Sequence, residues 1–385
     1  MGLCSAFLAT IGYACIGLFC APFIGTWLKS AVMNFGGPSI PWWIYAYAFT
    51  AIALWFAYRK IDLSAKVLFW VMLCEAAIVV IFDVASFIHG SPEGSTGSLM
   101  TVPNFGSGTV GMALLFATGN FTGFEATVIY REEVRNPDKT IPRATYAAVL
   151  GIGLFYFIAA IAYVVCFGSD KIQELAAANP DGLFLIGLGQ VTGKIIVDIA
   201  TVLTVFSTFA CLLSIQNVTT RYLYSLGVDG VLPKMLGKVH PKHKSPYLAA
   251  VVVSIAWGVM IAVFAFIGSD PNYLYPVFSG SGTFCVILIM FVATIAILFF
   301  MRRHKAEANA SAWVTTIAPI LAIIGMGIIT IYAVMNFGAL LGATGAKVVI
   351  FFIGVMCVGI AGIVLALYLK KNKPEVYEKI GRQEL

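Results

Sequence analysis

Residues 109–130 read TVGMALLFATGNFTGFEATVIY, an apolar stretch that small and polar residues interrupt near its middle. A helix needs about 20 consecutive, mostly apolar residues to cross a bilayer, and this stretch is long enough. Gly119, Asn120, Thr122 and Gly123, however, are poor helix formers and lie almost next to one another. The stretch therefore predicts a membrane span with an irregularity near the midplane.

Two interpretations of this irregularity are open. Gly119 and Gly123 have the G-x-x-x-G spacing at which two helices pack closely. Alternatively, the helix is discontinuous, and backbone groups freed at the break bind a substrate at the midplane, as in transporters. Glu125 favours the second interpretation, because a carboxylate is better tolerated beside a water-lined break than in a lipid-packed seam.

The whole chain has the composition of a membrane protein. Of its 385 residues, 60% are hydrophobic and only 11% are charged, whereas soluble domains carry about 25% charged residues. Apolar stretches recur along the full length and predict ten spans. These are 3–27, 41–58, 67–89, 109–130, 144–167, 192–218, 247–268, 276–301, 312–334 and 347–369. We therefore expect an all-α membrane protein with about ten transmembrane helices, a single transmembrane domain over 1–385 and a polar tail over 370–385.

The positive charges predict how the spans are oriented. When the loops and termini are assigned to alternate sides, 20 of the 24 Lys and Arg residues fall on one side. The other side holds Lys29, Lys171, Lys194 and Lys347. Because cytoplasmic loops are enriched in Lys and Arg, this distribution predicts a multi-pass protein of the cell membrane with both termini in the cytoplasm.

Several classes of function are disfavoured. The sequence contains no H-E-x-x-H or G-x-S-x-G motif and no complete phosphate-binding loop, so we expect neither an enzyme nor a resident cofactor. All eight cysteines lie in apolar stretches without zinc-ligand spacing, so we expect no metal site. The net charge of +6 is modest and does not suggest a nucleic-acid partner. The lipid bilayer is the expected environment.

Charged residues inside the spans are candidates for function, because they are costly in lipid. Lys194 and Asp198 are four residues apart near the outer end of their span, which predicts an exposed ion pair. Asp83 is closer to the outer face than Glu75, and we expect it to be hydrated or capped. Glu75 lies near the middle of its span with no basic residue within helical reach. It is either a proton-coupling or ion-site residue, or a protonated carboxyl that holds a neighbouring helix.

Two stretches of the chain resemble the amino acid/polyamine/organocation (APC) superfamily of permeases. The first is GFE at 123–125, followed by REEVRNPDKTIPRA at 131–144. The second runs from 206 to 246. It contains FS at 206–207, Asn217, RY at 221–222, LG at 226–227, DG at 229–230, LP at 232–233, HP at 240–241 and SP at 245–246. The first resembles the family's sixth helix and the loop after it, and the second resembles the eighth helix and its cytoplasmic loop.

The resemblance covers essentially the whole chain and implies a LeuT-type bundle. In that fold, helices 1–5 and 6–10 form inverted repeats about an axis in the membrane plane. If 109–130 corresponds to the sixth helix, then 3–27 corresponds to the third. We therefore expect the chain to lack the family's first two helices, so that the first repeat is incomplete.

The resemblance also implies roles for individual residues. The break in the sixth helix offers carbonyl groups to a substrate ammonium. These substrate-binding positions are Phe116, Ala117, Thr118, Gly119, Asn120, Phe121, Thr122 and Gly123. Tyr13 lies in the helix that often lends a tyrosine to the substrate chamber. Glu75 occupies the position where some proton-coupled relatives keep a lysine, and Ser207 and Thr208 match the other side of that ion site.

The expected function is secondary active transport of amino acids or related amines, by proton symport or exchange, with the substrate bound at the broken helix 109–130. The alternative is a membrane sensor or interaction subunit that uses the same scaffold without transport. The expected absence of the first two helices is the reason for this alternative.

Overall fold

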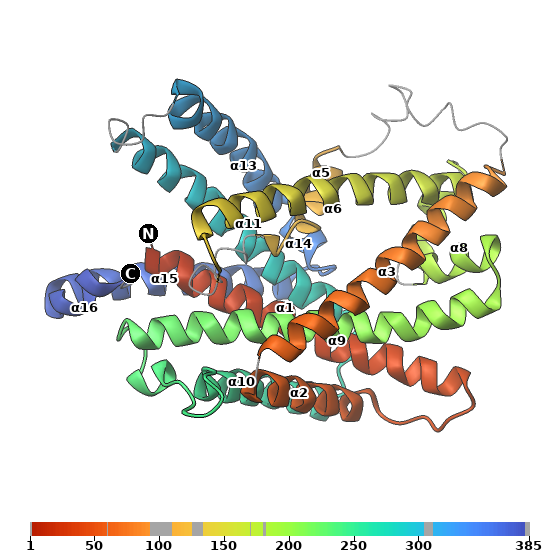
Figure 1. The fold of residues 1–385 in the computed structure, drawn as a ribbon, viewed down its shortest axis with the longest axis horizontal. Coiled ribbons are helices and arrows are strands. Elements are labelled where there is room, and N and C mark those ends of the chain that lie inside the picture. Colours follow the sequence, from red (N-terminus) through yellow and green to blue (C-terminus); the bar gives the residue numbers. More distant parts are fainter. Residues whose placement is uncertain are drawn as a thin grey trace.

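The computed structural model describes residues 2–59, 61–92, 110–124, 134–169, 171–179, 182–303 and 311–381. Within these ranges the chain is built from helices; α2, α6, α9 and α10 run along the long axis of the molecule, whereas α3, α11 and α13 are steeply tilted from it (Figure 1). The helices are α1 (Gly2–Asn34), α2 (Trp42–Arg59), α3 (Ile61–His89), α5 (Val110–Gly119), α6 (Pro137–Phe167), α7 (Ile172–Ala178), α8 (Leu183–Val191), α9 (Lys194–Val228), η3 (Lys234–Gly237), α10 (Tyr247–Phe266), α11 (Pro271–Arg303), the π-helical turn η4 (Trp313–Ile317), α13 (Ala318–Met335), α14 (Phe337–Leu340), α15 (Ala346–Asn372) and α16 (Pro374–Lys379).

Eight described helices are long and apolar enough to cross a membrane, and each coincides with an expected span. The expected span 41–58 is present as α2, an 18-residue helix that carries several Trp and Tyr residues and ends at Arg59; it is not among these eight. Of the span 109–130, only Val110–Gly119 is an α-helix among the described residues. The expectation of an all-α, multi-pass membrane bundle is confirmed.

Helix α1 is the centre of the bundle. It packs against α11, α9, α2, α15 and α10, and its buried residues include Tyr13 and Cys20. Gly12 of α1 and Gly282 of α11 allow the two backbones to approach closely: an ideal Cβ on Gly282 would lie 2.8 Å from the Gly12 carbonyl oxygen. Small residues at helix crossings let membrane helices pack without a hydrophobic driving force.

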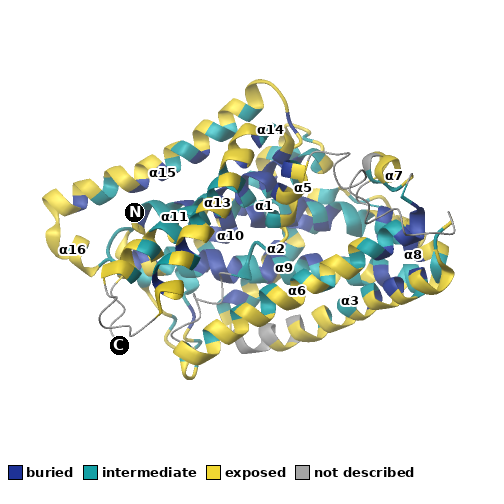
Figure 2. Cartoon of the chain, turned by 90° about the horizontal axis from the view of Figure 1, so that it is seen from above, coloured by how far each residue is buried: buried dark blue, intermediate teal, exposed yellow. Residues whose placement is uncertain are grey.

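Buried residues gather around α1, whereas the outer helices expose apolar side chains (Figure 2). Leu150 and Leu154 of α6 and Ile350 and Ile353 of α15 are examples of these exposed side chains. In water such a surface would be an aggregation hazard, but against lipid tails it costs nothing. The distribution of burial thus agrees with a bundle that is surrounded by a bilayer.

Both chain ends lie at the same end of the bundle (Figure 1). Leu3 of α1, Leu226 of α9 and Leu369 of α15 form one buried cluster there, and Val376 and Ile380 from the tail pack on it. The backbone N–H of Gly381 also donates to Oδ2 of Asp229, at 3.3 Å. The tail was expected to be merely polar, but its part up to Gly381 is docked by these two apolar side chains and this hydrogen bond.

Candidate functional site

Helix α5 ends where the sequence predicted an irregularity. The N–H of Asn120 is shared between the carbonyls of Phe116 and Ala117, at 3.2 Å each. The N–H groups of Phe121 and Thr122 then bond three residues back, to Thr118 and Gly119. This is the pattern of a tightening last turn rather than a continuing α-helix. The predicted departure from α-helical bonding is therefore confirmed, and it begins at Asn120.

Gly123 completes the end of the helix. Its φ angle of +112° lies in a region that residues with a Cβ rarely adopt. A glycine is thus required for the chain to leave the turn in this direction. Glu125, which was expected to stand beside the break, lies outside the described residues.

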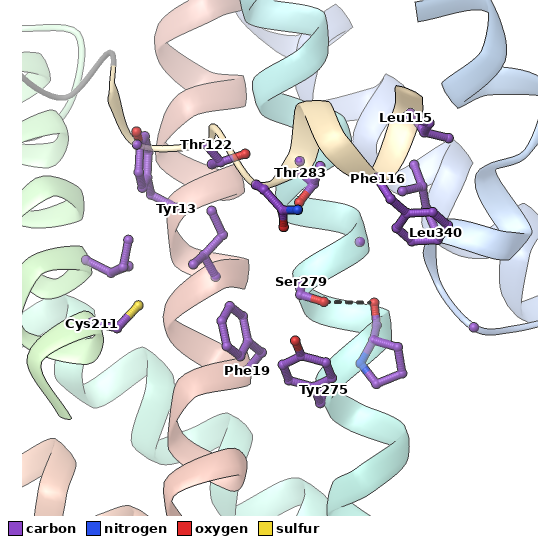
Figure 3. Close-up of a pocket in the computed structure, with 18 of the residues that line it drawn as sticks. Tyr13, Phe19, Leu115, Phe116, Thr122, Cys211, Tyr275, Ser279, Thr283 and Leu340 are labelled. Carbon is purple, nitrogen blue, oxygen red and sulfur yellow. Dashed lines mark hydrogen bonds between the residues drawn. The ribbon is translucent and has the colours of Figure 1, made fainter. Parts of the chain in front are cut away.

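A cavity of about 440 Å³ lies beneath this helix end. It is bounded by α1, α5, α9, α11, α14 and Gly342 just after α14, as Figure 3 shows for the residues labelled there. Its lining residues are Tyr13, Ile16, Phe19, Leu115, Phe116, Gly119, Asn120, Thr122, Gly123, Cys211, Ile215, Tyr275, Pro276, Ser279, Gly280, Thr283, Ala339, Leu340 and Gly342. The volume is within the range of small-molecule sites, about 300–1,000 Å³.

Aromatic rings form part of the wall and are held by other rings. Tyr13 stacks on Tyr222 of α9, with ring centroids 5.9 Å apart. Phe19 meets Tyr275 of α11 edge to face at 5.1 Å. Because these contacts join α1 to both α9 and α11, the rings that face the cavity are fixed by helices on either side of it.

The polar groups of the wall are neutral. Asn120, Thr122, Ser279 and Thr283 offer an amide and three hydroxyls. No Asp, Glu, Lys, Arg or His is among the described residues that line the cavity. A charged ligand group would therefore be recognised by dipoles and aromatic faces rather than by an ion pair.

Six of the nine predicted substrate-binding residues line the cavity: Tyr13, Phe116, Gly119, Asn120, Thr122 and Gly123. The structure places the other three outside the lining, because successive residues of a helix point in different directions. Ala117 is exposed. The Thr118 hydroxyl donates to the Leu114 carbonyl at 2.8 Å. The Phe121 ring lies against Tyr156 of α6, with centroids 6.5 Å apart.

The α11 wall was missing from the sequence prediction. Tyr275, Ser279, Gly280 and Thr283 all come from this helix. The signal that could have revealed them is the stretch PVFSGSGT at 276–283, which is unusually rich in small and polar residues for an apolar span. This stretch is similar in composition to the interrupted part of 109–130, and that similarity would have marked it as a second candidate substrate-binding segment.

Glu75 lies behind the α9 wall of the cavity. Its side chain is hydrogen-bonded to that of Ser207, and it interacts electrostatically with Cys211, which lines the cavity. The other oxygen, Oε1, is buried and has no hydrogen-bond partner among the described residues. Thr208 is buried, and its hydroxyl donates to the Thr204 carbonyl of its own helix at 2.9 Å. The structure thus brings Glu75 and Ser207 together, whereas the Thr208 hydroxyl is engaged within α9.

Lys194, Asp198 and Asp83 are further charged residues of the expected spans. Lys194 and Asp198 form the expected exposed ion pair, with Nζ and Oδ2 2.6 Å apart. Asp83 was expected to be hydrated or capped, but it is buried, with 5% of its surface exposed, and its Oδ1 has no partner among the described residues. The reason is that α6 and α8 pack over this part of α3, a contact that the sequence of α3 alone does not reveal.

The family model for "Amino acid permease" matches residues 5–378, which is nearly the whole chain. The chain belongs to the amino acid permease family. The resemblance to APC permeases is therefore confirmed, and the members of this family are transporters rather than enzymes. The helical bundle is consistent with the LeuT-type arrangement that the resemblance implied.

The curated relatives of this permease are named for different substrates. It is 27% identical over 328 residues to the gamma-aminobutyric acid permease of Escherichia coli (strain K12), which covers 80% of this chain and 66% of the relative. It is 26% identical over 243 residues to the low-affinity putrescine importer PlaP of the same organism, covering 60% and 52%. It is 24% identical over 359 residues to the aromatic amino acid permease FywP of Lactococcus lactis subsp. cremoris (strain MG1363), covering 82% and 75%. The permease thus spans about half to three quarters of the length of these relatives.

Proposed function

We propose that this permease is a secondary active transporter that carries amino acids or related amines across the cell membrane and binds them in the cavity beneath α5. The observation that carries the proposal is the coincidence of two features. The end of α5 at Asn120 to Gly123, in the middle of an expected span, forms a wall of a cavity of small-molecule size. Transporters place such breaks at their substrate sites because the helix ends supply polar backbone groups there.

The cavity suits an ammonium group at the end of α5. The C-terminal end of a helix carries a partial negative charge, which attracts cations. The carbonyls of Phe116 to Gly119 each accept one backbone N–H, and each carbonyl oxygen has a second lone pair for a ligand. The faces of Tyr13, Phe19 and Tyr275 add cation–π attraction at the same cavity.

The remaining walls suit the other parts of an amino acid. The Asn120 amide and the Thr283 hydroxyl can donate to a carboxylate. Ile16 and Ile215 form an apolar wall for an aliphatic or aromatic side chain. These groups define a class of ligand, namely a small molecule with an ammonium group and a modest apolar part. The substrates for which the relatives are named are consistent with this class, and they serve as the probes below.

Uptake by the full chain in proteoliposomes tests the proposal. Labelled γ-aminobutyric acid, putrescine and phenylalanine are supplied under an imposed pH gradient. We expect saturable uptake of at least one of them, and its loss in Asn120→Ala together with Thr283→Ala. Binding of a probe without uptake by the wild type would favour the alternative, a sensor or interaction subunit on the same scaffold.

We further propose that transport is coupled to protons through Glu75. It lies at membrane depth beside Ser207 and close to Cys211, at the back of the cavity wall. Glu75→Gln imitates the protonated carboxyl, so we expect the variant to bind the probe normally but to lose the dependence of uptake on the pH gradient. Asp198→Asn, which changes an exposed carboxyl on the neighbouring helix, is the matched control and should keep that dependence. If Glu75→Gln keeps it as well, Glu75 is a structural hydrogen-bonding group.

A further inference from the structure

Two cysteines from separate helices meet beside the cavity. The Cys20 thiol of α1 donates to Sγ of Cys211 of α9, with the two sulfur atoms 3.6 Å apart. Both are free thiols. A disulfide bond is about 2.05 Å long, so the two sulfur atoms need to approach by only roughly 1.5 Å to become bonded. Side-chain rotation supplies a movement of this size without moving a helix.

The two cysteines have different access to solutes. Cys20 is fully buried among Ala53, Leu212 and Trp257. Cys211 is half-buried and lines the cavity. In Figure 3 its sulfur is turned away from α9 toward α1. A solute in the cavity can therefore reach Cys211 but not Cys20.

The geometry also gives the two thiols different roles. Because the Cys20 S–H points at Cys211, it stabilises negative charge on the Cys211 sulfur, and the thiolate is the reactive form of cysteine. The cavity wall carries no charged side chain among its described residues, so it admits a small neutral oxidant. Hydrogen peroxide is such an oxidant.

We propose that Cys20 and Cys211 form an oxidation site that a peroxide reaches through the cavity. Cys211 attacks one peroxide oxygen, the O–O bond breaks, and the products are a sulfenic acid on Cys211 and one water. The Cys20 sulfur then attacks the Cys211 sulfur, the S–O bond breaks, and hydroxide leaves with the Cys20 proton as a second water. Two thiols and one peroxide thus give one disulfide and two waters, with each sulfur losing one electron and each peroxide oxygen gaining one.

The disulfide would join α1 to α9 and draw Cys211 away from the cavity wall. These two helices contribute Tyr13, Phe19 and Ile215 to the same wall, so the cross-link fixes the relative positions of groups that line the cavity. The proposal concerns the two thiols themselves and does not depend on which solute the permease carries.

Peptide mapping of the full chain in membranes tests the site. The membranes are treated with hydrogen peroxide, free thiols are blocked with N-ethylmaleimide, and the digested protein is analysed by mass spectrometry. We expect a linked pair of peptides that contain Cys20 and Cys211. The pair should be absent from Cys20→Ser and Cys211→Ser and present in Cys166→Ser, a control whose buried thiol lies instead near the Gly187 carbonyl and the Gln190 side chain. If Cys20 and Cys211 remain alkylated after oxidation, or if Cys211 is linked to another cysteine, the proposal is wrong.

Trapping of the intermediate with dimedone tests the order of the steps. In Cys20→Ser the sulfenic acid on Cys211 has no thiol to resolve it, so we expect dimedone on Cys211. In Cys211→Ser we expect none on Cys20, because Cys20 does not face the cavity. Equal labelling of Cys20 in the second variant would overturn the assignment of Cys211 as the residue that reacts with peroxide.

Discussion

Gly280 of α11 lies directly against Leu340, the last residue of α14, on the side of the cavity that α14 closes. An ideal Cβ on Gly280 would lie 2.1 Å from the Leu340 carbonyl oxygen. Because the obstacle is backbone, it cannot rotate away as a side chain can. Gly280 and Leu340 both line the cavity, so the absence of a side chain at this position determines how tightly this side of the cavity is closed.

Gly280→Ala should therefore lower the free energy of unfolding of the purified permease by roughly 1–3 kcal/mol, as at other overpacked sites. Gly325→Ala is the matched control, since a Cβ on Gly325 of α13 meets nothing within 4 Å. Alanine is also the better helix former, so the control should be neutral or slightly stabilising. Thermal unfolding of the two variants in the same detergent measures the difference. Equal midpoints would show that the contact at Leu340 does not constrain α11.

At the residue scale, the sequence predicted what depends on local propensity. Gly119, Asn120 and Gly123 are poor helix formers wherever they occur, so the end of α5 was predictable. The direction of Phe121 was not, because it depends on where α6 packs. The contribution of Ser279 and Thr283 was not predicted either, because it depends on α11 lying opposite the end of α5.

At the scale of elements, the docked tail is held partly by a titratable group. Asp229 follows α9 and accepts a hydrogen bond from the Gly381 N–H. Burial raises the pKa of Asp229 above its usual value, and the hydrogen bond from Gly381 opposes this shift only in part. The folded state therefore binds a proton at Asp229 more readily than the unfolded chain does.

The sign of the effect on stability follows from this pKa. Below the ordinary Asp value, about 3.9, Asp229 is protonated in both the folded and the unfolded state, and its contribution to stability is fully present. As pH rises from there to the raised pKa, the unfolded state loses its proton first, so this contribution falls and then levels off. Thermal unfolding of the purified permease should thus show that the wild type loses stability relative to Asp229→Asn as pH rises through this window.

Asp229→Asn should remove this pH dependence while keeping an oxygen acceptor for Gly381. Glu375→Gln, which changes an exposed carboxyl on α16 itself, is the control and should behave as the wild type. If the Asn variant keeps the wild-type pH dependence of unfolding, another group is responsible for it.

The lengths of the elements show where sequence patterns stop being informative. Apolarity located the eight long helices, but it placed the end of α9 near 218, whereas the helix continues to Val228. The extra turns contain polar residues that are buried by other helices, such as Thr219 and Thr220. The start of α6 at Pro137 was missed for a related reason: its first turns are polar, although proline suits the first position of a helix.

At the scale of the whole molecule, the position of α1 organises the fold. It is the helix that contacts α9 and α11 at once, and the cavity lies where these three helices meet the end of α5. Hydropathy identifies such a helix but does not show that it is central. The charge distribution, by contrast, is a global property of the sequence, and it predicts which ends of the helices face the cytoplasm.

Labelling of single cysteines in intact cells tests that orientation. In a cysteine-free background, Lys139→Cys and Lys242→Cys should be protected from a membrane-impermeant maleimide, whereas Asp270→Cys should react. The reason is that 20 of the 24 Lys and Arg residues fall on the side that holds Lys139 and Lys242. Reaction of Lys242→Cys with the maleimide from outside the cell would contradict the predicted orientation.

Binding of a ligand to the purified full chain tests the central claim most directly. Isothermal titration with γ-aminobutyric acid, putrescine and phenylalanine is compared between the wild type, Ser279→Phe and Ile297→Phe. The first variant places a ring in the cavity, and the second places the same ring on the exposed face of the same helix. We predict saturable binding of at least one ligand to the wild type and to Ile297→Phe, and its loss in Ser279→Phe. If the wild type binds and Ser279→Phe binds equally well, or if none of the ligands binds the folded wild type, the cavity beneath α5 is not the substrate site of this permease.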